Sequence, residues 1–493
     1  MADQDGVWIG IDVGTQSVRV LAVDGCGRGV GSGNEPLTSH RNGSRHEQDP
    51  EQWWDAVAAA SRSALSGVDP GRIRCLAVDG TSGTILLADR RGRPLTAGLM
   101  YDDGRASAEV ERVNEVGSAI WEALGYRRMQ PTWALPKLIW LLGNHPELRS
   151  GGTRLLHQPD VVTWRLIGRQ TPTDSSHALK TGFHLIEERW PTEALVALDV
   201  PEDLLPPVVR AGTVLGGVCT LAAEQTGIPE GTLVVAGMTD GCAAQLGTGA
   251  LHIGAWNSVL GTTLVLKGVS EHLVHDPAGV VYSHRAPDGG WLPGGASNTG
   301  AGALAHIFAG RDLDVLGEQA ACREPAGAVI YPLVSRGERF PFHAPQAEGF
   351  VLGQPADEVD HYAGVLQGVA FIERLCFDYL DMLGAPAHDA VRFTGGGTGS
   401  RYWCQLRTDI LGRSAQLPEN TEPVLGMAIL AASAGRPLAE VAAEMVRVRE
   451  VIEPRDGRTD VFLEPYLRLV DELAHRGWLS REVASYARGN AEQ

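Results

Sequence analysis

The chain has 493 residues, of which 43% are hydrophobic and 21% charged, and its formal net charge is −18. This length exceeds what one hydrophobic core usually supports, so we expect two domains of roughly 200 to 250 residues each. The excess of negative charge repels nucleic-acid phosphates and anionic membranes, and no basic patch offsets it, so neither nucleic acid nor membrane is an expected partner.

Short apolar runs alternate with helical patterns in the first third of the chain. A turn signal of the form Asp-x-x-Gly-Arg follows the runs twice, at residues 24–28 and 89–93, and predicts sheet-building hairpins. Apolar residues at helical spacing separate these hairpins. Alternating strands and helices give an α/β fold class. The expected strands are 7–11, 18–23, 73–78 and 85–88, and the expected helices are 50–65 and 133–142.

The second half repeats the opening signal. Residues 258–263 lead through Gly-Thr-Thr into an expected strand at 264–266, as residues 12–17 lead into the strand at 18–23. We interpret this as two related lobes, each opening with a Gly-Thr turn. The further expected elements are a helix at 362–380, a strand at 390–393, helices at 403–410 and 424–434, and an amphipathic helix after about residue 464.

An acidic side chain closes the first strand. In Asp12-Val-Gly-Thr-Gln-Ser17 the small residues let backbone N–H groups approach a phosphate. Asp12 is then placed to hold Mg²⁺ through water, and Thr15 and Ser17 are placed to donate to phosphoryl oxygens. The alternative is a tight hairpin in which Asp12 only bonds its own turn, and the local sequence does not separate the two.

A second acidic residue, Asp240, follows an expected buried strand at 234–237 and precedes a small-residue helix at 242–246. Phosphoryl transfer to a hydroxyl needs a carboxylate aimed at the attacking oxygen. The alternative is that Asp240 caps the helix, which local sequence alone favours. The chain has no Gly-x-x-x-x-Gly-Lys-Ser/Thr, which excludes a P-loop, and no Gly-x-Gly-x-x-Gly after a strand, which disfavours a dinucleotide-binding oxidoreductase.

Several motifs occur together in a fixed order. They are Asp-Val-Gly-Thr-Gln-Ser-Val-Arg at 12–19, Gly-Met-Thr-Asp-Gly at 237–241, Gly-Thr-Thr at 261–263, Gly-Glu-Arg-Phe-Pro at 337–341 and Gly-Gly-Gly at 395–397. Gln48-Asp49-Pro50 and Thr173-Asp174 fit the same pattern. Over residues 7–435 the chain resembles the FGGY carbohydrate kinases. The resemblance implies two α/β lobes of the actin/hexokinase (ribonuclease H-like) type, with an ATP cleft between them.

The resemblance also implies a role for each matching residue. Asp240 matches the catalytic base, and Asp12 and Asp240 match the acids beside Mg²⁺. Glycine in the turn at 395–397 lets adenine lie flat against the backbone. The residues expected to bind ATP are Gly14, Thr15, Gln16 and Ser17, then Gly261, Thr262 and Thr263, then Gly395, Gly396, Gly397, Ser400 and Trp403.

The segments expected at the sugar differ from those of two branches of the family. Where xylulose kinases carry Gln-Met-His-Gly, this chain has Asp79-Gly-Thr-Ser-Gly-Thr84, and where glycerol kinases carry Trp-x-x-x-Arg it has Met100-Tyr-Asp-Asp-Gly-Arg105. Both segments resemble the D-ribulose kinase branch. Ordinary turn and cap duty is the alternative for each residue. The expected substrate-binding residues are Asp12, Thr81, Ser82, Asp102, Asp103 and Arg105.

Three positions depart from the family pattern: Gly399, Gln367 and His177 stand where Lys or Arg, Glu and Asn are usual. Gly399 puts one phosphate contact in question. His177 is expected to be a structural histidine whose hydrogen bonds are satisfied.

The sequence therefore predicts ATP-dependent phosphorylation of a ketopentose, with D-ribulose as the acceptor. The alternatives are a xylulose or polyol kinase of the same family, or a non-catalytic sugar-sensing protein on the same fold, which intact Asp12 and Asp240 disfavour. An actin-class chaperone ATPase is disfavoured by residues 337–341. The predicted domains are 1–250 for the sugar and the base, 251–465 for the nucleotide, and 466–493 for a C-terminal helix and polar tail.

The remaining expectations concern location and partners. Seven scattered cysteines without a Cys-x-x-Cys pair argue against a disulfide framework and a zinc site. The polar, acidic start and the lack of an apolar run of about 18 residues predict a cytoplasmic protein. Its expected partners are a small sugar and ATP, and we expect a monomer or homodimer.

Overall fold

The computed structural model describes residues 5–149 and 152–491, which divide into two compact units. The first unit comprises Met1–Leu251, His284–Trp291 and Asn420–Arg447, and the second comprises His252–Ser283, Leu292–Glu419 and Val448–Gln493. Each unit has its own hydrophobic core. No helix in the described ranges is long and apolar enough to cross a membrane.

The first unit is built on a six-stranded sheet with the order β12-β13-β6-β1-β2-β3. Its strands are β12 (Val214–Gly217), β13 (Leu233–Val235), β6 (Ile73–Gly80), β1 (Val7–Val13), β2 (Ser17–Asp24) and β3 (Gly29–Pro36). A five-stranded sheet contains β4 (His40–Asn42), β5 (Arg45–Gln48), β8 (Gly98–Leu99), β7 (Ile85–Ala88) and β9 (Arg154–His157), in that order, and β10 (Thr173–Asp174) pairs with β11 (Val208–Val209).

Helices pack around these sheets. They are α1 (Pro50–Leu65), α2 (Val110–Ala123), α3 (Ala134–Asn144), α4 (Gln158–Ile167), α5 (Ser175–Ala178), α6 (Thr192–Ala197), α7 (Thr220–Thr226), α8 (Asp240–Gly247), α13 (Pro423–Ala432) and α14 (Leu438–Met445).

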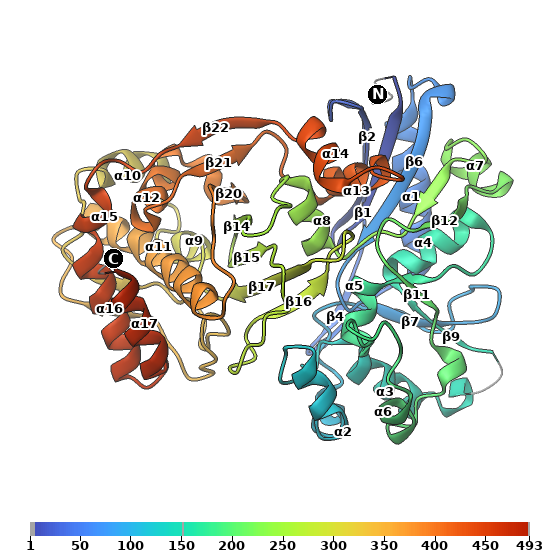
Figure 1. The fold of residues 1–493 in the computed structure, drawn as a ribbon, viewed down its shortest axis with the longest axis horizontal. Coiled ribbons are helices and arrows are strands. Elements are labelled where there is room, and N and C mark those ends of the chain that lie inside the picture. Colours follow the sequence, from blue (N-terminus) through green and yellow to red (C-terminus); the bar gives the residue numbers. More distant parts are fainter. Residues whose placement is uncertain (1–4, 150–151, 492–493) are drawn as a thin grey trace. The chain divides into compact units, whose positions relative to one another are not determined.

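The return of α13 and α14 to the first unit depends on two close backbone approaches. A Cβ atom on Gly10 would lie 1.9 Å from the carbonyl oxygen of Val424, and one on Gly426 would lie 1.9 Å from that of Ala243. Glycine thus lets α13 pack directly on β1 and on α8. In Figure 1 the orange-red α13 lies beside the blue strands β1 and β2. Residues 420–447 therefore pack with the first unit, whereas the sequence prediction grouped them with 251–465.

The second unit contains most of a seven-stranded sheet with the order β16-β17-β15-β14-β20-β21-β22. Its strands are β16 (Tyr282–Arg285), β17 (Trp291–Ser297), β15 (Leu264–Gly268), β14 (Trp256–Leu260), β20 (Val391–Thr394), β21 (Ala415–Pro418) and β22 (Val448–Ile452), and β18 (Val329–Tyr331) pairs with β19 (Phe350–Leu352). Its helices are α9 (Gly302–Ile307), α10 (Leu313–Ala320), α11 (Glu358–Met382), α12 (Arg401–Leu411), α15 (Arg458–Val461), α16 (Leu463–His475) and α17 (Arg481–Ala491).

The structure confirms a hairpin at both predicted turns: residues 24–28 join β2 to the antiparallel β3, and residues 89–93 join β7 to the antiparallel segment that ends in β8. β1 and β2 pair antiparallel, as expected. β6 and β7 do not form a hairpin, because β6 lies between β1 and β13 and has no free edge, and β7 belongs to the other sheet. The predicted helix at 50–65 is α1, with Asp49 as its N-cap.

Candidate active site

Three acidic side chains of the first unit lie at or just beyond the carboxyl ends of neighbouring parallel strands. β1 and β6 run parallel with Asp12 opposite Asp79. β13 is parallel to β6 on its other side, and a bridge from Gly80 to Thr239 carries this pairing to the residue before Asp240. Because the carboxyl ends of parallel strands meet at one edge of a sheet, the three carboxylates are near enough to influence one another's charge.

Asp240 is the first residue of α8, and Thr239 occupies the N-cap position. Its carboxylate Oδ1 accepts a hydrogen bond of 2.7 Å from the N–H of Gly241, and the side chain is half-buried. The helix cap that the sequence offered as the alternative is therefore Thr239, and Asp240 lies one residue inside the helix. Its assignment as the catalytic base stays a prediction.

Asp12 and Asp79 are buried carboxylates, and few neighbouring groups compensate their negative charge. Burial raises the pKa of Asp12 to about 6, and the charge of Asp240 acts in the same direction against a hydrogen bond with Asp79. Asp79 is fully buried, and burial followed by the charge of Asp12 raises its pKa well above the usual value. Apart from Asp12, no described residue gives a hydrogen bond to either oxygen of Asp79. This edge therefore favours a cation or a hydroxyl donor.

These two acids fit a magnesium ion that arrives with nucleotide phosphates. Within residues 5–149 and 152–491 no group of three or more His, Cys, Asp or Glu side chains is arranged to hold a metal ion. Mg²⁺ at phosphotransfer sites, however, needs only one or two protein carboxylates, because phosphates and water complete its shell. The buried oxygens of Asp79, which have no hydrogen-bond partner other than Asp12 among the described residues, meet that requirement.

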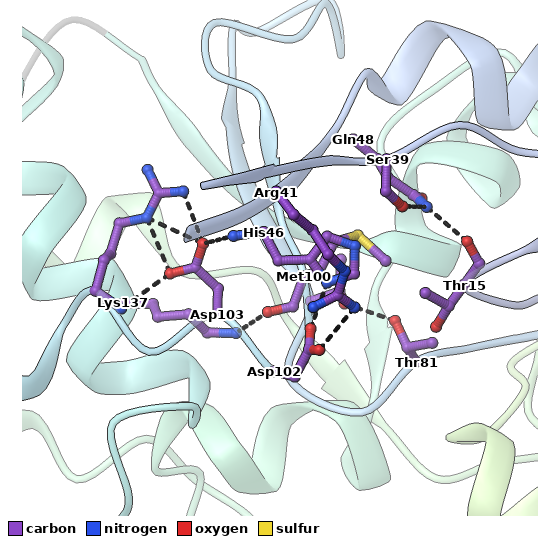
Figure 2. Close-up of polar contacts among 12 residues, drawn as sticks. Thr15, Ser39, Arg41, His46, Gln48, Thr81, Met100, Asp102, Asp103 and Lys137 are labelled. Carbon is purple, nitrogen blue, oxygen red and sulfur yellow. Dashed lines mark hydrogen bonds and ion pairs between the residues drawn. The ribbon is translucent and has the colours of Figure 1, made fainter. Parts of the chain in front are cut away.

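The turn between β1 and β2 is fixed from behind by a buried glutamine. The N–H of Gly14 donates to the carbonyl of Ser17 at 3.1 Å and closes the turn. Gln48 Nε2 donates to the carbonyl of Thr15 at 2.7 Å and to Ser39 Oγ at 2.9 Å, as Figure 2 shows. The hydroxyls of Thr15 and Ser17 make no hydrogen bond to any described residue, so both are available to a phosphate. Gln16 is exposed at the tip.

The second unit carries a matching pair of turns after parallel strands. β14 and β20 are parallel neighbours, so the turns that follow them lie at one edge of their sheet. Gly261 closes the first turn, which continues through Thr262 and Thr263, by donating to the carbonyl of Thr263 at 3.0 Å. The second turn is Gly395 to Gly397.

The glycines of this second turn differ in their surroundings. Gly395 has φ +82°, and a Cβ there would lie 2.6 Å from the carbonyl oxygen of Leu260, so only glycine fits. A Cβ on Gly397 would lie 2.7 Å from Cδ2 of the same leucine. A Cβ on Gly396 would meet nothing within 4 Å, so the backbone there borders open space.

Ser400 and Trp403, also expected on the nucleotide side, make structural contacts. Ser400 is the N-cap of α12, and its Oγ accepts from the N–H of Trp403 at 3.2 Å. Trp403 is buried, and its indole N–H donates to the carbonyl of Leu366 at 3.2 Å. These contacts hold the helix that follows the glycine turn, and a direct contact of either side chain with adenosine stays a prediction.

On the sugar side, three of the predicted residues bond within the protein. Thr81 Oγ1 donates to Gln158 Oε1 at 2.7 Å. Asp103 and Arg105 form a buried ion pair of 2.7 Å, and the guanidinium also bonds Glu47 at 2.6 Å. The contacts of Thr81, Asp103 and Arg105 are therefore those of the alternative, in which these residues stabilise turns of the protein itself. Their contact with a sugar remains a prediction.

Asp102 is more open, and its two oxygens are held by residues that the sequence did not identify. Arg41 Nη2 donates to Asp102 Oδ2 at 2.9 Å, and His46 Nδ1 bonds Asp102 Oδ1 (Figure 2). Burial alone would raise the pKa of Asp102, but the hydrogen bonds to His46 and Arg41 outweigh it and lower the pKa. The carboxylate is thus held ionised and 31% exposed, able to accept from a further hydroxyl.

Two more side chains complete this region. Ser82 Oγ is buried and bonds no described residue. A ligand hydroxyl can supply the hydrogen-bond partner that this group lacks. Lys137 is fully buried, and its Nζ donates to the carbonyl of Met100 at 2.8 Å (Figure 2). Burial, with the charge of Lys180, lowers the pKa of Lys137 to about 7. Lys137 thus fixes the turn that presents Asp102.

Comparison with known proteins agrees with this arrangement. The N-terminal domain of the FGGY family of carbohydrate kinases matches residues 7–247, and the C-terminal domain of the same family matches residues 242–435. A xylulose kinase of Streptomyces coelicolor is 31% identical over 452 residues, covering 89% of this chain and 90% of its own. A xylulose kinase of Klebsiella pneumoniae is 30% identical over 448 residues, covering 86% of this chain and 89% of its own.

Solved structures show the same fold. The crystal structure of xylulose kinase from Rhodospirillum rubrum matches with a TM-score of 0.86 and 26% identity, over 95% of this chain and 98% of that one. The predicted α/β class with two lobes is thereby confirmed. Together with the motifs at the sheet edges, these matches establish that the chain belongs to the FGGY family of carbohydrate kinases and is an ATP-dependent sugar kinase.

Proposed function

We propose that this chain transfers the γ-phosphoryl group of ATP to a hydroxyl of a ketopentose. The observation that carries the proposal is the convergence of Asp12, Asp79 and Asp240 after three parallel strands, beside a turn with two available hydroxyls. Asp240 accepts the proton of the attacking hydroxyl, which is the one proton transfer that phosphoryl transfer requires of the protein.

The other residues bind and orient the two substrates. The turns at Gly14 to Ser17 and Gly261 to Thr263 bind phosphates, and the turn at Gly395 to Gly397 borders adenine. Asp12 and Asp79 would hold Mg²⁺, which when bound supplies positive charge to the phosphate oxygens. In this proposal the first unit binds the sugar and carries the base, and the second binds the nucleotide.

D-ribulose is our proposed acceptor. The support is that the segment at 79–84 lacks Gln-Met-His-Gly, and that its Ser82 presents a buried hydroxyl without a partner. D-ribulose and D-xylulose differ only in configuration at C3, so one hydroxyl that finds or loses its partner separates them. An unpaired buried group costs roughly 1 to 3 kcal/mol, which corresponds to about 5- to 150-fold in kcat/KM.

D-xylulose is the second candidate, because the relatives named above are xylulose kinases. The test is ADP release measured with D-ribulose, D-xylulose, glycerol and pentitols. A higher kcat/KM for D-ribulose supports the proposal. A higher kcat/KM for D-xylulose or a polyol would make that compound the acceptor in place of D-ribulose. If ADP release does not depend on any of these sugars, the proposed reaction is refuted.

A pair of serine variants tests whether Ser82 reads the sugar. Ser82→Ala should narrow the ratio of kcat/KM between the two ketopentoses. Ser61 is the matched control, since its Oγ is also buried and without a partner, but it lies in α1. Ser61→Ala should leave the ratio unchanged, and equal ratios in wild type and Ser82→Ala would remove Ser82 from substrate selection.

A further inference from the structure

A short buried segment lies directly behind the acidic edge of the first unit. Asp174 is the N-cap of α5, and its Oδ1 accepts from the N–H groups of Ser176 and His177 at 2.8 and 3.0 Å. Oδ1 also accepts from Ser176 Oγ at 2.6 Å, and Oδ2 bonds His177 Nδ1 at 2.6 Å. All three residues are almost completely buried. One carboxylate thus orients both a serine hydroxyl and an imidazole.

Each of these side chains reaches a different catalytic strand end. Ser176 Oγ, whose hydrogen is committed to Asp174, accepts from the N–H of Thr239 at 2.9 Å. Thr239 is the residue before the proposed base. His177 Nε2 bonds the carbonyl oxygen of Gly80 at 3.3 Å, one residue beyond Asp79. Gly80 and Thr239 are themselves bridged. The segment therefore contacts both strand ends.

The partners of His177 determine its protonation state. A carboxylate and a backbone carbonyl are both acceptors, so both ring nitrogens must donate and the imidazole is a cation. Burial alone would lower the pKa of His177, but the charge and hydrogen bond of Asp174 outweigh it and raise the pKa. The ion pair is buried, and such a pair is most useful where it fixes one geometry.

We infer that Asp174, Ser176 and His177 are positioning residues for phosphoryl transfer, and that they set the separation between the Asp240 turn and the Asp79 end of β6. None of the three touches the reacting atoms in this inference. The inference rests on the proposed role of Asp240. A displacement of about 1 Å at a reacting group can cost on the order of 100-fold in rate. We call Asp174, Ser176 and His177 the brace, and the loss of one of its contacts should therefore lower kcat.

The test uses variants of the full-length protein. Ser176→Ala removes the acceptor of the Thr239 N–H and should lower kcat by about 10- to 100-fold, with far smaller changes in KM for ATP and sugar. Ser176→Thr keeps the hydroxyl and should restore most of kcat. His177→Gln removes the cation and should also lower kcat.

His157 offers a matched control. It is fully buried and bonds Asp160 three residues later at 3.0 Å, and its Nε2 bonds Thr181 rather than a catalytic strand end. His157→Gln should lower the melting temperature, with kcat of the folded enzyme near that of wild type. If Ser176→Ala and His177→Gln lose no more kcat than His157→Gln, the inference is overturned.

Hydrogen exchange gives a readout that is independent of activity. In Ser176→Ala the amides of residues 237–241 should exchange faster than in wild type or in His157→Gln. Unchanged exchange there in Ser176→Ala would also overturn the inference, and if that variant does not fold, His177→Gln decides with the amides of residues 79–82. A wild type that releases no ADP with any sugar refutes the proposed function, whereas the exchange result still tests the brace.

Discussion

Because Asp12 is a buried acid at the sheet edge, we expect that removing its charge stabilises the folded protein. Asp12 has its pKa raised from 3.8 to about 6, chiefly by burial. A shift of roughly 2 units at 1.36 kcal/mol per unit means that ionised Asp12 costs the folded state about 3 kcal/mol at pH 7.5. Asp12→Asn removes this charge. In metal-free buffer its melting temperature should therefore exceed that of wild type by about 3 to 5 °C, while its kinase activity is lost.

The sign of the pH dependence follows from the same values. Between pH 3.8 and about 6 the folded state binds more protons at Asp12 than the unfolded state does. The contribution of this group to the free energy of unfolding therefore falls as pH rises through that window and is constant above it. The gain in the free energy of unfolding of Asp12→Asn over wild type should be largest above pH 6, and at pH 5 it should be about half as large.

The assay is thermal unfolding from pH 5 to pH 8 in EDTA. Asp24 is the control, because it lies at the other end of the β1–β2 hairpin, opposite Val7, and accepts from the N–H groups of Cys26 and Arg28 at 2.9 and 3.1 Å. Burial would raise the pKa of Asp24, but these bonds and the Arg28 guanidinium lower it. Asp24→Asn should therefore destabilise. An Asp12→Asn protein that melts below wild type at pH 7.5 would refute the electrostatic argument.

Three further predictions follow from the sites. Asp240→Asn should lose kcat on the order of 100-fold or more while calorimetry still detects ATP binding, and near wild-type turnover would exclude Asp240 as the base. Gly396→Val should fold normally and weaken ATP binding far more than sugar binding, whereas Gly395→Ala should lower the melting temperature; unchanged ATP affinity in Gly396→Val would place the nucleotide elsewhere. Asp103→Ala leaves the Arg105 guanidinium buried with one fewer partner and should destabilise by about 3 to 5 kcal/mol in denaturant titration, so a stability near wild type would contradict that reading.

Local periodicity was enough to predict the elements that carry the site. The runs at 7–11 and 73–78 and the helix at 50–65 appear as β1, β6 and α1 with small changes at their ends. The separation of β6 and β7 into different sheets could not be predicted from their spacing, because strand pairing is decided by edges that distant segments occupy. The packing of residues 420–447 on β1 likewise depends on a close approach across most of the chain.

Among the site residues, the sequence identified the acids after strands better than the residues that hold them. Asp79 was not singled out, although it ends an apolar run as Asp12 does, and that shared signal was available. Gln48 was noted only as part of a motif. His46 and Arg41 could not be found from spacing, since they reach Asp102 across 56 and 61 residues. A hydrogen-bond partner that far along the chain leaves no local pattern.

The charges at the sheet edge divide into two kinds, and this division relates stability to chemistry. Asp174 is compensated inside the protein, because His177 pairs with it at 2.6 Å, and this pair can fix geometry at little further electrostatic cost. Burial and the charge of Asp240 raise the pKa of Asp12, and burial and the charge of Asp12 raise that of Asp79, and neither carboxylate has an ion-pair partner among the described residues that offsets these causes as His177 does for Asp174. A cation bound beside them would remove that penalty. Folding energy lost at these two acids is therefore recoverable as binding energy for the metal–nucleotide substrate, and a variant that stabilises the empty protein by neutralising either acid should weaken magnesium-dependent nucleotide binding in the same measurement series.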